Sequence, residues 1–177
     1  MAEDGESVDD VTETDQILPV TEQLHGAPVV GEPANQVAFP DLEQLVDISR
    51  ALKADGYVMC VDLTAVDHLH APAVHLPAGV QGARFELVVS LINHGERRRL
   101  RLRVQLPGDE PVVPTLFDVW PGTEAMEREV FDMFGITFEG HPDHTRVLMP
   151  EDWIGHPLRK DYAVGRIPVQ FKGAPTR

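Results

Sequence analysis

Two neighbouring stretches of the chain alternate between apolar and polar residues, the pattern of strands that bury one face. The apolar positions are Phe85, Leu87, Val89 and Leu91 in 84–92, and Leu100, Leu102, Val104 and Leu106 in 97–106. Between the stretches lies Asn93-His94-Gly95, a combination typical of turns. The pattern predicts an antiparallel hairpin whose opposite face carries Arg99, Arg101 and Arg103.

Upstream, the spacing of apolar residues predicts a helix from Asp41 to about Ala54, followed by a strand over 57–63. The strand is apolar on both faces, so we expect it in the middle of the sheet, with Cys60 as a small core residue. The segment 65–82 is interpreted as a hairpin connection, with a short extra strand within it as the alternative, and a further short strand is expected over 115–120.

A second helix is predicted from an N-cap at Thr123 to Phe134, with Gly135 ending it. One face is apolar, and the other carries Arg128, Glu129 and Asp132, where the i,i+4 spacing allows Arg128 to pair with Asp132. Helices alternating with strands predict an α+β domain over 39–138. We expect a small mixed or antiparallel sheet with the helices packed on one face.

Residues 139–177 form a predicted extended arm. The tripeptide Gly-His-Pro occurs at 140–142 and again at 155–157, and proline prevents helix continuation. The segment still carries many large apolar residues, too many for a free tail. We therefore expect the arm to dock on another surface. Its apolar residues are Val147, Leu148, Met149, Trp153, Ile154, Leu158 and Tyr162.

The charge is unevenly distributed. The formal net charge is −14, and the first fifteen residues hold seven acids and no base. Residues 1–38 also lack sustained periodicity, so they are predicted to be a disordered acidic extension. The start of the chain is acidic rather than basic, which argues against a signal peptide. No apolar run approaches the roughly twenty residues that span a bilayer, so any membrane association is expected to run through partners.

One cysteine, Cys60, excludes an internal disulfide and cannot supply the four ligands that an iron–sulfur cluster normally needs. The sequence also lacks a glycine-rich phosphate loop. These features predict no cofactor, no metal and no catalytic centre in this chain.

The stretch ERExxDMFGIxFxGHP, followed by RxLMPEDWxGHPLRKDY over 127–162, resembles the C-subunit (NuoC) family of the proton-pumping NADH:quinone oxidoreductase, respiratory complex I. A weaker likeness extends back to about Tyr57. Met126 stands where family members tend to have Trp, and Thr145-Arg146 where they tend to have two Arg.

The resemblance implies a cofactor-free assembly subunit of the hydrophilic arm of complex I, on the cytoplasmic side of the cell membrane. The D subunit and cluster-bearing neighbours would be its partners, and FMN, iron–sulfur clusters and quinone would belong to those partners. A related membrane-bound hydrogenase-type complex is the alternative. The residues expected to anchor the arm or form the interface are Arg128, Glu129, Asp132, His141, Arg146, Trp153, His156, Arg159, Lys160 and Asp161.

Two other functions fit less well. A metal-dependent hydrolase could use His141, Asp143, His144 and His156, but Pro142 and Pro157 interrupt the helical spacing that paired histidine ligands use. Nucleic-acid binding by the arginine-rich strand is disfavoured, because no aromatic residues are interleaved and the chain is acidic overall. Pairing of these arginines with acids such as Glu86 is the expected alternative.

Overall fold

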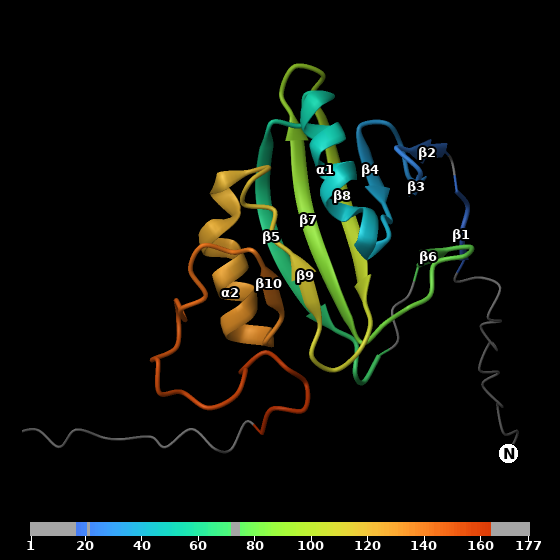
Figure 1. The fold of residues 1–177 in the computed structure, drawn as a ribbon. Coiled ribbons are helices and arrows are strands. Elements are labelled where there is room, and N and C mark those ends of the chain that lie inside the picture. Colours follow the sequence, from blue (N-terminus) through green and yellow to red (C-terminus); the bar gives the residue numbers. More distant parts are fainter. Residues whose placement is uncertain (1–16, 21, 72–74, 164–177) are drawn as a thin grey trace, which may run out of the picture.

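The computed structural model describes residues 17–20, 22–71 and 75–163 (Figure 1). Its main layer is a six-stranded sheet in the order β2-β3-β4-β8-β7-β5. The strands are β2 (Glu22–Leu24), β3 (Ala27–Val30), β4 (Asn35–Ala38), β5 (Met59–Asp67), β7 (Phe85–Asn93) and β8 (Arg98–Leu106). Since β4 pairs with β8 in parallel and the other neighbours are antiparallel, the sheet is mixed.

The hairpin of β7 and β8 lies inside the sheet, between β4 and β5, and confirms the prediction from alternation. Phe85 lies opposite Leu106 and Leu91 opposite Leu100, so all the predicted apolar positions share one face. Each of those side chains is at most 1% exposed. Burial of one face and not the other fixes the register, because a slip by one residue would exchange the two faces.

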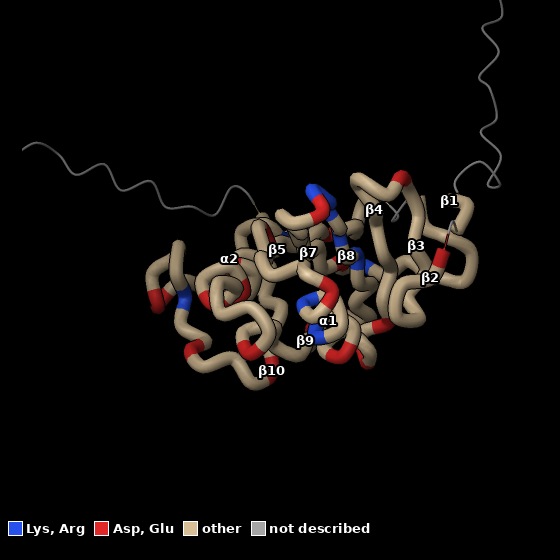
Figure 2. Tube along the Cα trace, turned by 90° about the horizontal axis from the view of Figure 1, so that it is seen from above, with Lys and Arg blue, Asp and Glu red and all other residues tan. Residues whose placement is uncertain are grey.

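Two helices, α1 (Leu45–Ala54) and α2 (Glu124–Phe134), cover that apolar face. Seen along the strands, both helices lie on the same side of the sheet, as expected for the predicted α+β class (Figure 2). Leu45, Ile48 and Leu52 of α1 and Val130 of α2 join the sheet residues in one hydrophobic core. Short 3-10 turns, 42–44 and 121–123, precede the helices.

Two small parallel pairs complete the fold. β9 (Val112–Pro114) pairs with β10 (Thr137–Glu139) beside α2, and β1 (Ile17–Leu18) pairs with β6 (Leu76–Pro77). Val113 and Phe138 of the first pair are fully buried, so this pair extends the core toward the end of α2.

The prediction that residues 1–38 are a disordered extension is wrong for 22–38, which form β2, β3 and β4. Val29 and Ala38 are buried in the core, and β4 adds a parallel partner to β8. These strands have at most four residues and contain or adjoin Pro28 and Gly31, so no periodicity develops. Residues 1–16 and 21 lie outside the described part of the chain.

Two strand predictions also need correction. β5 is at the edge of the sheet and not in its middle: Met59 and Val61 leave 48% and 41% of their surface exposed on the uncovered face. Segment 115–120 is a loop, in which the N–H groups of Val119 and Trp120 both bond the carbonyl of Leu116. The short strand lies just before it, at β9.

Across the described ranges, none of the helices is long and apolar enough to cross a membrane.

Candidate interface site at the braced C-terminal arm

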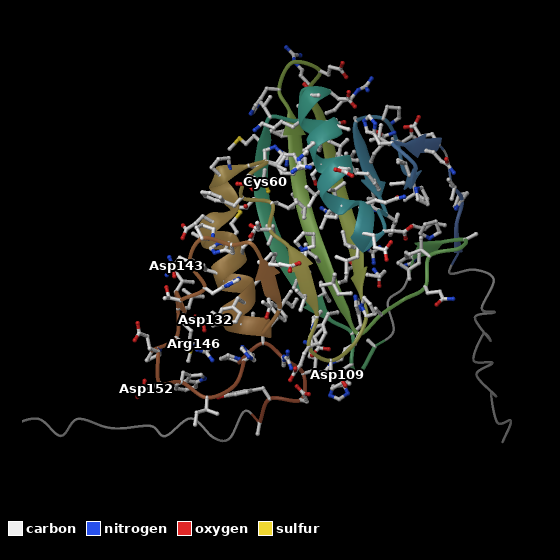
Figure 3. All side chains as sticks on the ribbon, viewed as in Figure 1. Cys60, Asp109, Asp132, Asp143, Arg146 and Asp152 are labelled. Atoms are coloured by element: carbon white, nitrogen blue, oxygen red, sulfur yellow. The ribbon has the colours of Figure 1, made fainter. Side chains whose placement is uncertain are left out.

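Residue 139 of the predicted arm ends β10, and 164–177 lie outside the described residues. From 140 to 163 the arm contains no helix or strand, as predicted, yet it lies against its own domain below α2 (Figures 1 and 3). Its first attachment is Asp132 near the end of α2. One carboxylate oxygen of Asp132 accepts the backbone N–H groups of Val147, Leu148 and Met149 at 3.1, 2.8 and 2.8 Å. The other oxygen accepts Arg146 at 2.5 Å. A loop without regular structure thus satisfies three consecutive amides on one side chain.

Asp132 and Arg146 form a buried ion pair. Asp132 is fully buried and the Arg146 side chain is 14% exposed. Burial by itself would raise the pKa of Asp132, but the amide donors of Met149, Leu148 and Val147 and the guanidinium of Arg146 outweigh it, so the pKa lies below its usual value. Arg146 also donates to the carbonyl of Gly155 at 3.0 Å, which fixes the second Gly-His-Pro turn.

The C-terminal end of α2 provides the second attachment. His156 Nδ1 lies 3.0 Å from the carbonyl of Asp132, and Arg159 Nε donates to the carbonyl of Phe134 at 2.5 Å. Burial lowers the pKa of His156. Gly135 adopts a left-handed φ of 70°, and a Cβ there would lie 2.6 Å from the His156 ring. Glycine therefore both ends the helix and lets the arm approach it.

A third attachment joins the arm to the bottom of the sheet. Asp67, the last residue of β5, is fully buried and accepts two bonds from Arg84 and the backbone N–H of Lys160 at 2.9 Å. Arg84 also contacts Asp161 at 2.8 Å. Burial opposes ionisation of Asp67, but its donors prevail and lower its pKa. The guanidinium of Arg159 lies over the ring of Phe85, 5.1 Å from its centroid, which closes the end of the core.

Arg128 binds the start of the arm. Its guanidinium donates to the carbonyl and hydroxyl of Thr145 at 3.1 and 2.7 Å and to Glu124 at 3.1 Å. The i,i+4 pairing of Arg128 with Asp132 that the sequence allowed does not occur, because the arm brings Arg146 to Asp132 instead. Glu129, on the same helix, is exposed.

His141 is buried under α2 beside a carboxylate that the sequence reading overlooked. Its Nδ1 accepts the N–H of Asp143 at 3.0 Å, so Nε2 carries the proton and donates to the carbonyl of Glu124. Glu127 is fully buried 4.0 Å away and accepts bonds from Thr123, Thr115 and the N–H of Leu116. Thr123 is the N-cap as predicted, but its hydroxyl bonds Glu127 and not a backbone amide.

Asp67, Arg84 and Glu127 are the structurally important residues that the sequence reading missed. Glu127 and the sheet residues Asp67 and Glu86 are each less than 5% exposed. Charged residues are almost never that buried unless paired. A carboxylate at an inward position of an apolar alternation was the available signal: Asp67 continues the inward positions Leu63 and Ala65. The expected pairing of Glu86 with the arginine-rich strand is confirmed by Arg103 at 2.6 Å.

Most of the predicted interface residues are therefore bonded to other parts of the same chain. A different set of residues on the arm is exposed. Leu148, Ile154 and Leu158 are 60%, 90% and 50% exposed. Glu151 and Asp152 are also exposed, and Figure 3 places Asp152 at the outer side of the arm. Trp153 is half-buried, and its indole N–H has no partner in the described part of the chain. The Lys160 side chain is exposed, although its backbone is bound.

No three His, Cys, Asp or Glu side chains of the described ranges gather in a metal-binding arrangement. The two nitrogens of His141 are both hydrogen-bonded, and its ring stacks on that of His144 at 5.2 Å. The four residues of the hydrolase hypothesis are thus not brought together as a site.

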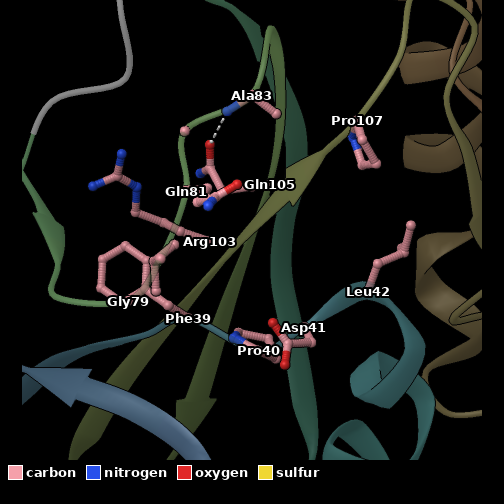
Figure 4. Close-up of a pocket in the computed structure, with 12 residues that line it drawn as sticks. Phe39, Pro40, Asp41, Leu42, Gly79, Gln81, Ala83, Arg103, Gln105 and Pro107 are labelled. Atoms are coloured by element: carbon pink, nitrogen blue, oxygen red, sulfur yellow. Dashed lines mark hydrogen bonds between the residues drawn. The ribbon is translucent and has the colours of Figure 1, made fainter.

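A hollow of about 370 Å³ lies between residues 39–42, which precede α1, and residues 79–83 (Figure 4). Arg103 and Gln105 line it, but both side chains bond Glu86, and Gln105 also accepts the N–H of Ala83 at 3.0 Å. The side chains of Arg103 and Gln105 are thus already engaged by Glu86 and Ala83.

The architecture is that of a small α+β domain whose non-regular C-terminal segment is attached to the domain by buried carboxylates. Residues 40–167 match the family model of the respiratory-chain NADH dehydrogenase 30 Kd subunit. The chain belongs to this family.

Named relatives agree. The chain is 43% identical over 139 residues to the NADH-quinone oxidoreductase C subunit of Saccharopolyspora erythraea, covering 77% of this chain and 52% of that protein. It is 50% identical over 101 residues to the corresponding C subunit of Acidothermus cellulolyticus, covering 57% and 52% of the two chains. The chain thus spans about half the length of the curated relatives it matches.

Two solved structures share the fold. The trypsin-resistant fragment (1-134) of Nqo5 superposes with a TM-score of 0.58 and 31% identity, covering 67% of this chain and 90% of the fragment. A chain of the membrane-bound sulfane sulfur reductase, an archaeal respiratory membrane complex, gives a TM-score of 0.60 at 24% identity, covering 85% and 89%. At that identity the second likeness concerns the fold.

Proposed function

We propose that the chain is an assembly subunit of proton-translocating NADH:quinone oxidoreductase and itself carries no cofactor and no catalytic centre. Family membership and the names of the relatives support the assignment to this enzyme. The single, buried Cys60 supports the absence of a cluster. Burial raises the pKa of its thiol to about 12, and a thiol that stays protonated is a poor metal ligand.

The observation that carries the docking role is the braced arm with its exposed apolar residues. Three buried attachments hold the backbone of the arm, while the side chains of Leu148, Ile154 and Leu158 leave half or more of their surface exposed. Apolar side chains on a pre-ordered support lose little conformational entropy on binding, so they are suited to be interface anchors.

The partners that the family resemblance implies are the D subunit and the cluster-bearing subunits of the hydrophilic arm. FMN, iron–sulfur clusters and quinone would reside in those subunits. The chain would then be a peripheral component on the cytoplasmic side of the cell membrane, held there by the complex.

An equivalent role in a hydrogenase-type membrane complex is the second candidate, favoured only by the shared fold of the sulfane sulfur reductase chain. Native co-purification separates the two. Partners that bind flavin and NADH support the NADH:quinone oxidoreductase, whereas a nickel-bearing large subunit supports the hydrogenase-type complex.

Replacement of the outward residues tests the docking role. We expect the double variant Leu148→Ser, Ile154→Ser to fold normally and to be lost from the membrane complex, with loss of NADH:quinone activity. Val112→Ser is the matched control, because Val112 is also apolar and 51% exposed but belongs to β9 and not to the arm. Normal incorporation of the double variant would overturn the proposal.

A further inference from the structure

The face of the sheet opposite the helices carries a row of arginines, and the nearest acids are Glu96, which pairs with Arg98, and Asp62 on the outer strand β5. No helix of the described residues covers this face (Figure 2). Arg99 and Arg101 of β8 point to it and are exposed, and Arg97 follows at the hairpin turn with a left-handed φ of 56°. A hollow of about 260 Å³ beside the turn is lined by Arg97, Arg98 and Arg99.

The strands on both sides of β8 offer these arginines no carboxylate. Arg99 lies between Asn35 of β4 and Ile92 of β7, and Arg101 lies between Val37 and Ser90. A smaller hollow next to them is lined by Val61, Ser90 and the two arginines. Opposite charges on directly paired residues of neighbouring strands stabilise a sheet, but the residues paired with Arg99 and Arg101 are all uncharged.

The other arginines of the described chain are engaged. Arg84, Arg103 and Arg146 bind buried carboxylates, Arg128 and Arg98 pair with Glu124 and Glu96, Arg50 pairs with Asp47, and Arg159 binds the end of α2. Within the described ranges, Arg97, Arg99 and Arg101 have neither an ion pair nor a side-chain hydrogen bond to a carboxylate. The row is thus a concentrated positive surface on a chain of net charge −14.

The chain itself contains a segment of complementary charge, attached close to this face. Residues 3–15 carry the seven acids Glu3, Asp4, Glu6, Asp9, Asp10, Glu13 and Asp15 and no base. The segment leads into β1, which pairs with β6, and Arg103 on β8 donates to the carbonyl of His75 next to β6 at 3.4 Å. The acidic segment therefore enters the described structure beside the lower end of the arginine row.

We propose that the acidic segment 3–15 docks on the Arg97–Arg99–Arg101 row of its own chain and screens this surface. The reach is sufficient. The row from Arg103 to Arg97 is about 20 Å long at the rise of a strand, whereas the thirteen residues of the segment span up to about 45 Å when extended.

Tethering makes such weak pairing effective. A segment fixed at one end has an effective concentration of the order of millimolar at its target, so several carboxylates can exchange over the three guanidiniums without a rigid fit. The surface is exposed, so the interaction is screened by salt, with a Debye length of about 8 Å at physiological ionic strength. Strong salt dependence is therefore part of the proposal.

A nitroxide attached at Ser7→Cys in the full chain tests it directly. Cys60 is buried, so the new thiol is labelled selectively. We expect the label to remove the amide NMR signals of Arg99 and Arg101 at low salt, and these signals to return at high salt. The variant Arg99→Gln, Arg101→Gln is expected to prevent the effect at neighbouring amides of β8. Arg50→Gln is the matched control, because Arg50 is an exposed arginine of α1, and it should leave the effect unchanged.

Two results would overturn the proposal. Signal loss spread evenly over the domain, or unaffected by Arg99→Gln, Arg101→Gln, would show that the segment does not select this row. The second result comes from a mixture of a nitroxide-labelled chain without ¹⁵N and a ¹⁵N-labelled chain without nitroxide. Loss of the ¹⁵N signals in this mixture would show that a second copy supplies the segment. The measurement uses the isolated chain, so its outcome is independent of assembly into the respiratory complex.

Discussion

The backbone N–H of Lys160 donates to the carboxylate of Asp67 at 2.9 Å, across 93 positions of sequence. This bond joins the distal part of the arm to the end of an edge strand that precedes the central hairpin in the chain. Together with the ion pair of Asp132 and Arg146, it makes the arm part of the folded domain and not an appendage waiting for a partner.

Replacing Asp132 by Asn should destabilise the domain strongly. The variant removes the charge that Arg146 pairs with and weakens the acceptor for three backbone amides. Breaking a buried ion pair on one side typically costs about 3–5 kcal/mol. Urea unfolding measures the change, and Asp152→Asn, at an exposed position of the arm, should stay within about 0.5 kcal/mol of the parent. Equal effects of the two variants would contradict the buried role.

Stability should fall with acid in a way that depends on Asp132 and Asp67. Both have a folded-state pKa below the unfolded value, so the unfolded state binds more protons as pH falls. Their contribution is complete above the unfolded pKa of about 3.9 and is lost as pH falls through the lower folded values. Unfolding free energies measured from neutral pH to below pH 3 should decline less steeply in Asp132→Asn than in the parent. Parallel curves would exclude Asp132 as a source.

Gly135→Ala should loosen the arm. A Cβ at this position would lie 2.6 Å from His156 and 2.8 Å from Arg159, besides the left-handed backbone strain of about 1–2 kcal/mol. Gly79→Ala is the matched control, because Gly79 has a φ of 90° but nothing within 4 Å of the added atom. We expect trypsin to cleave after Arg159 and Lys160 faster in Gly135→Ala than in Gly79→Ala. The same cleavage rate in both would mean that the close approach of the arm is unimportant.

Truncation after Met149 should leave a folded domain that no longer assembles. The buried apolar residues of the core end at Phe138, and the three amides that bind Asp132 are retained. The truncated chain loses Ile154 and Leu158 and the bonds from Arg159 and Lys160. Calorimetry of the truncated chain checks that the domain still folds. The NADH:quinone activity of membranes that contain the truncated chain checks that assembly is lost. An unfolded product would show that the distal arm is part of the core.

Local pattern was enough for the elements whose partners are close in sequence. The hairpin of β7 and β8 needs only alternation and a turn, and α2 needs only a periodic face with Gly135 at its end. The strands in 22–38 were missed because β4 finds its partner in β8, more than sixty residues later. Pairing over that distance leaves no signature in four residues.

The sequence predicted the C-terminal arm as a distinct segment, but it did not predict the hydrogen-bond partners that hold the arm. Gly-His-Pro repeats and clustered charges identified the arm, whereas the partners of Asp132 and Arg128 depend on where the arm crosses α2. Helix geometry alone favoured a pair between those two residues. Tertiary contact replaced it with one that buries the carboxylate.

Because the arm is attached at both ends, the residues that hold it to the domain are separate from the residues that it presents to a partner. Asp132 and Asp67 hold the chain near Met149 and Lys160, and the residues between them form a closed loop on the surface. The entropic cost of closing a loop grows only by about 0.6 kcal/mol when its length doubles. Within that loop, His156 and Arg159 bind the end of α2, so the positions open to substitution at little risk to the sheet are exposed ones such as Asp152 and Ile154. During evolution, the residues that this loop presents to a partner could change while the rest of the domain stays the same.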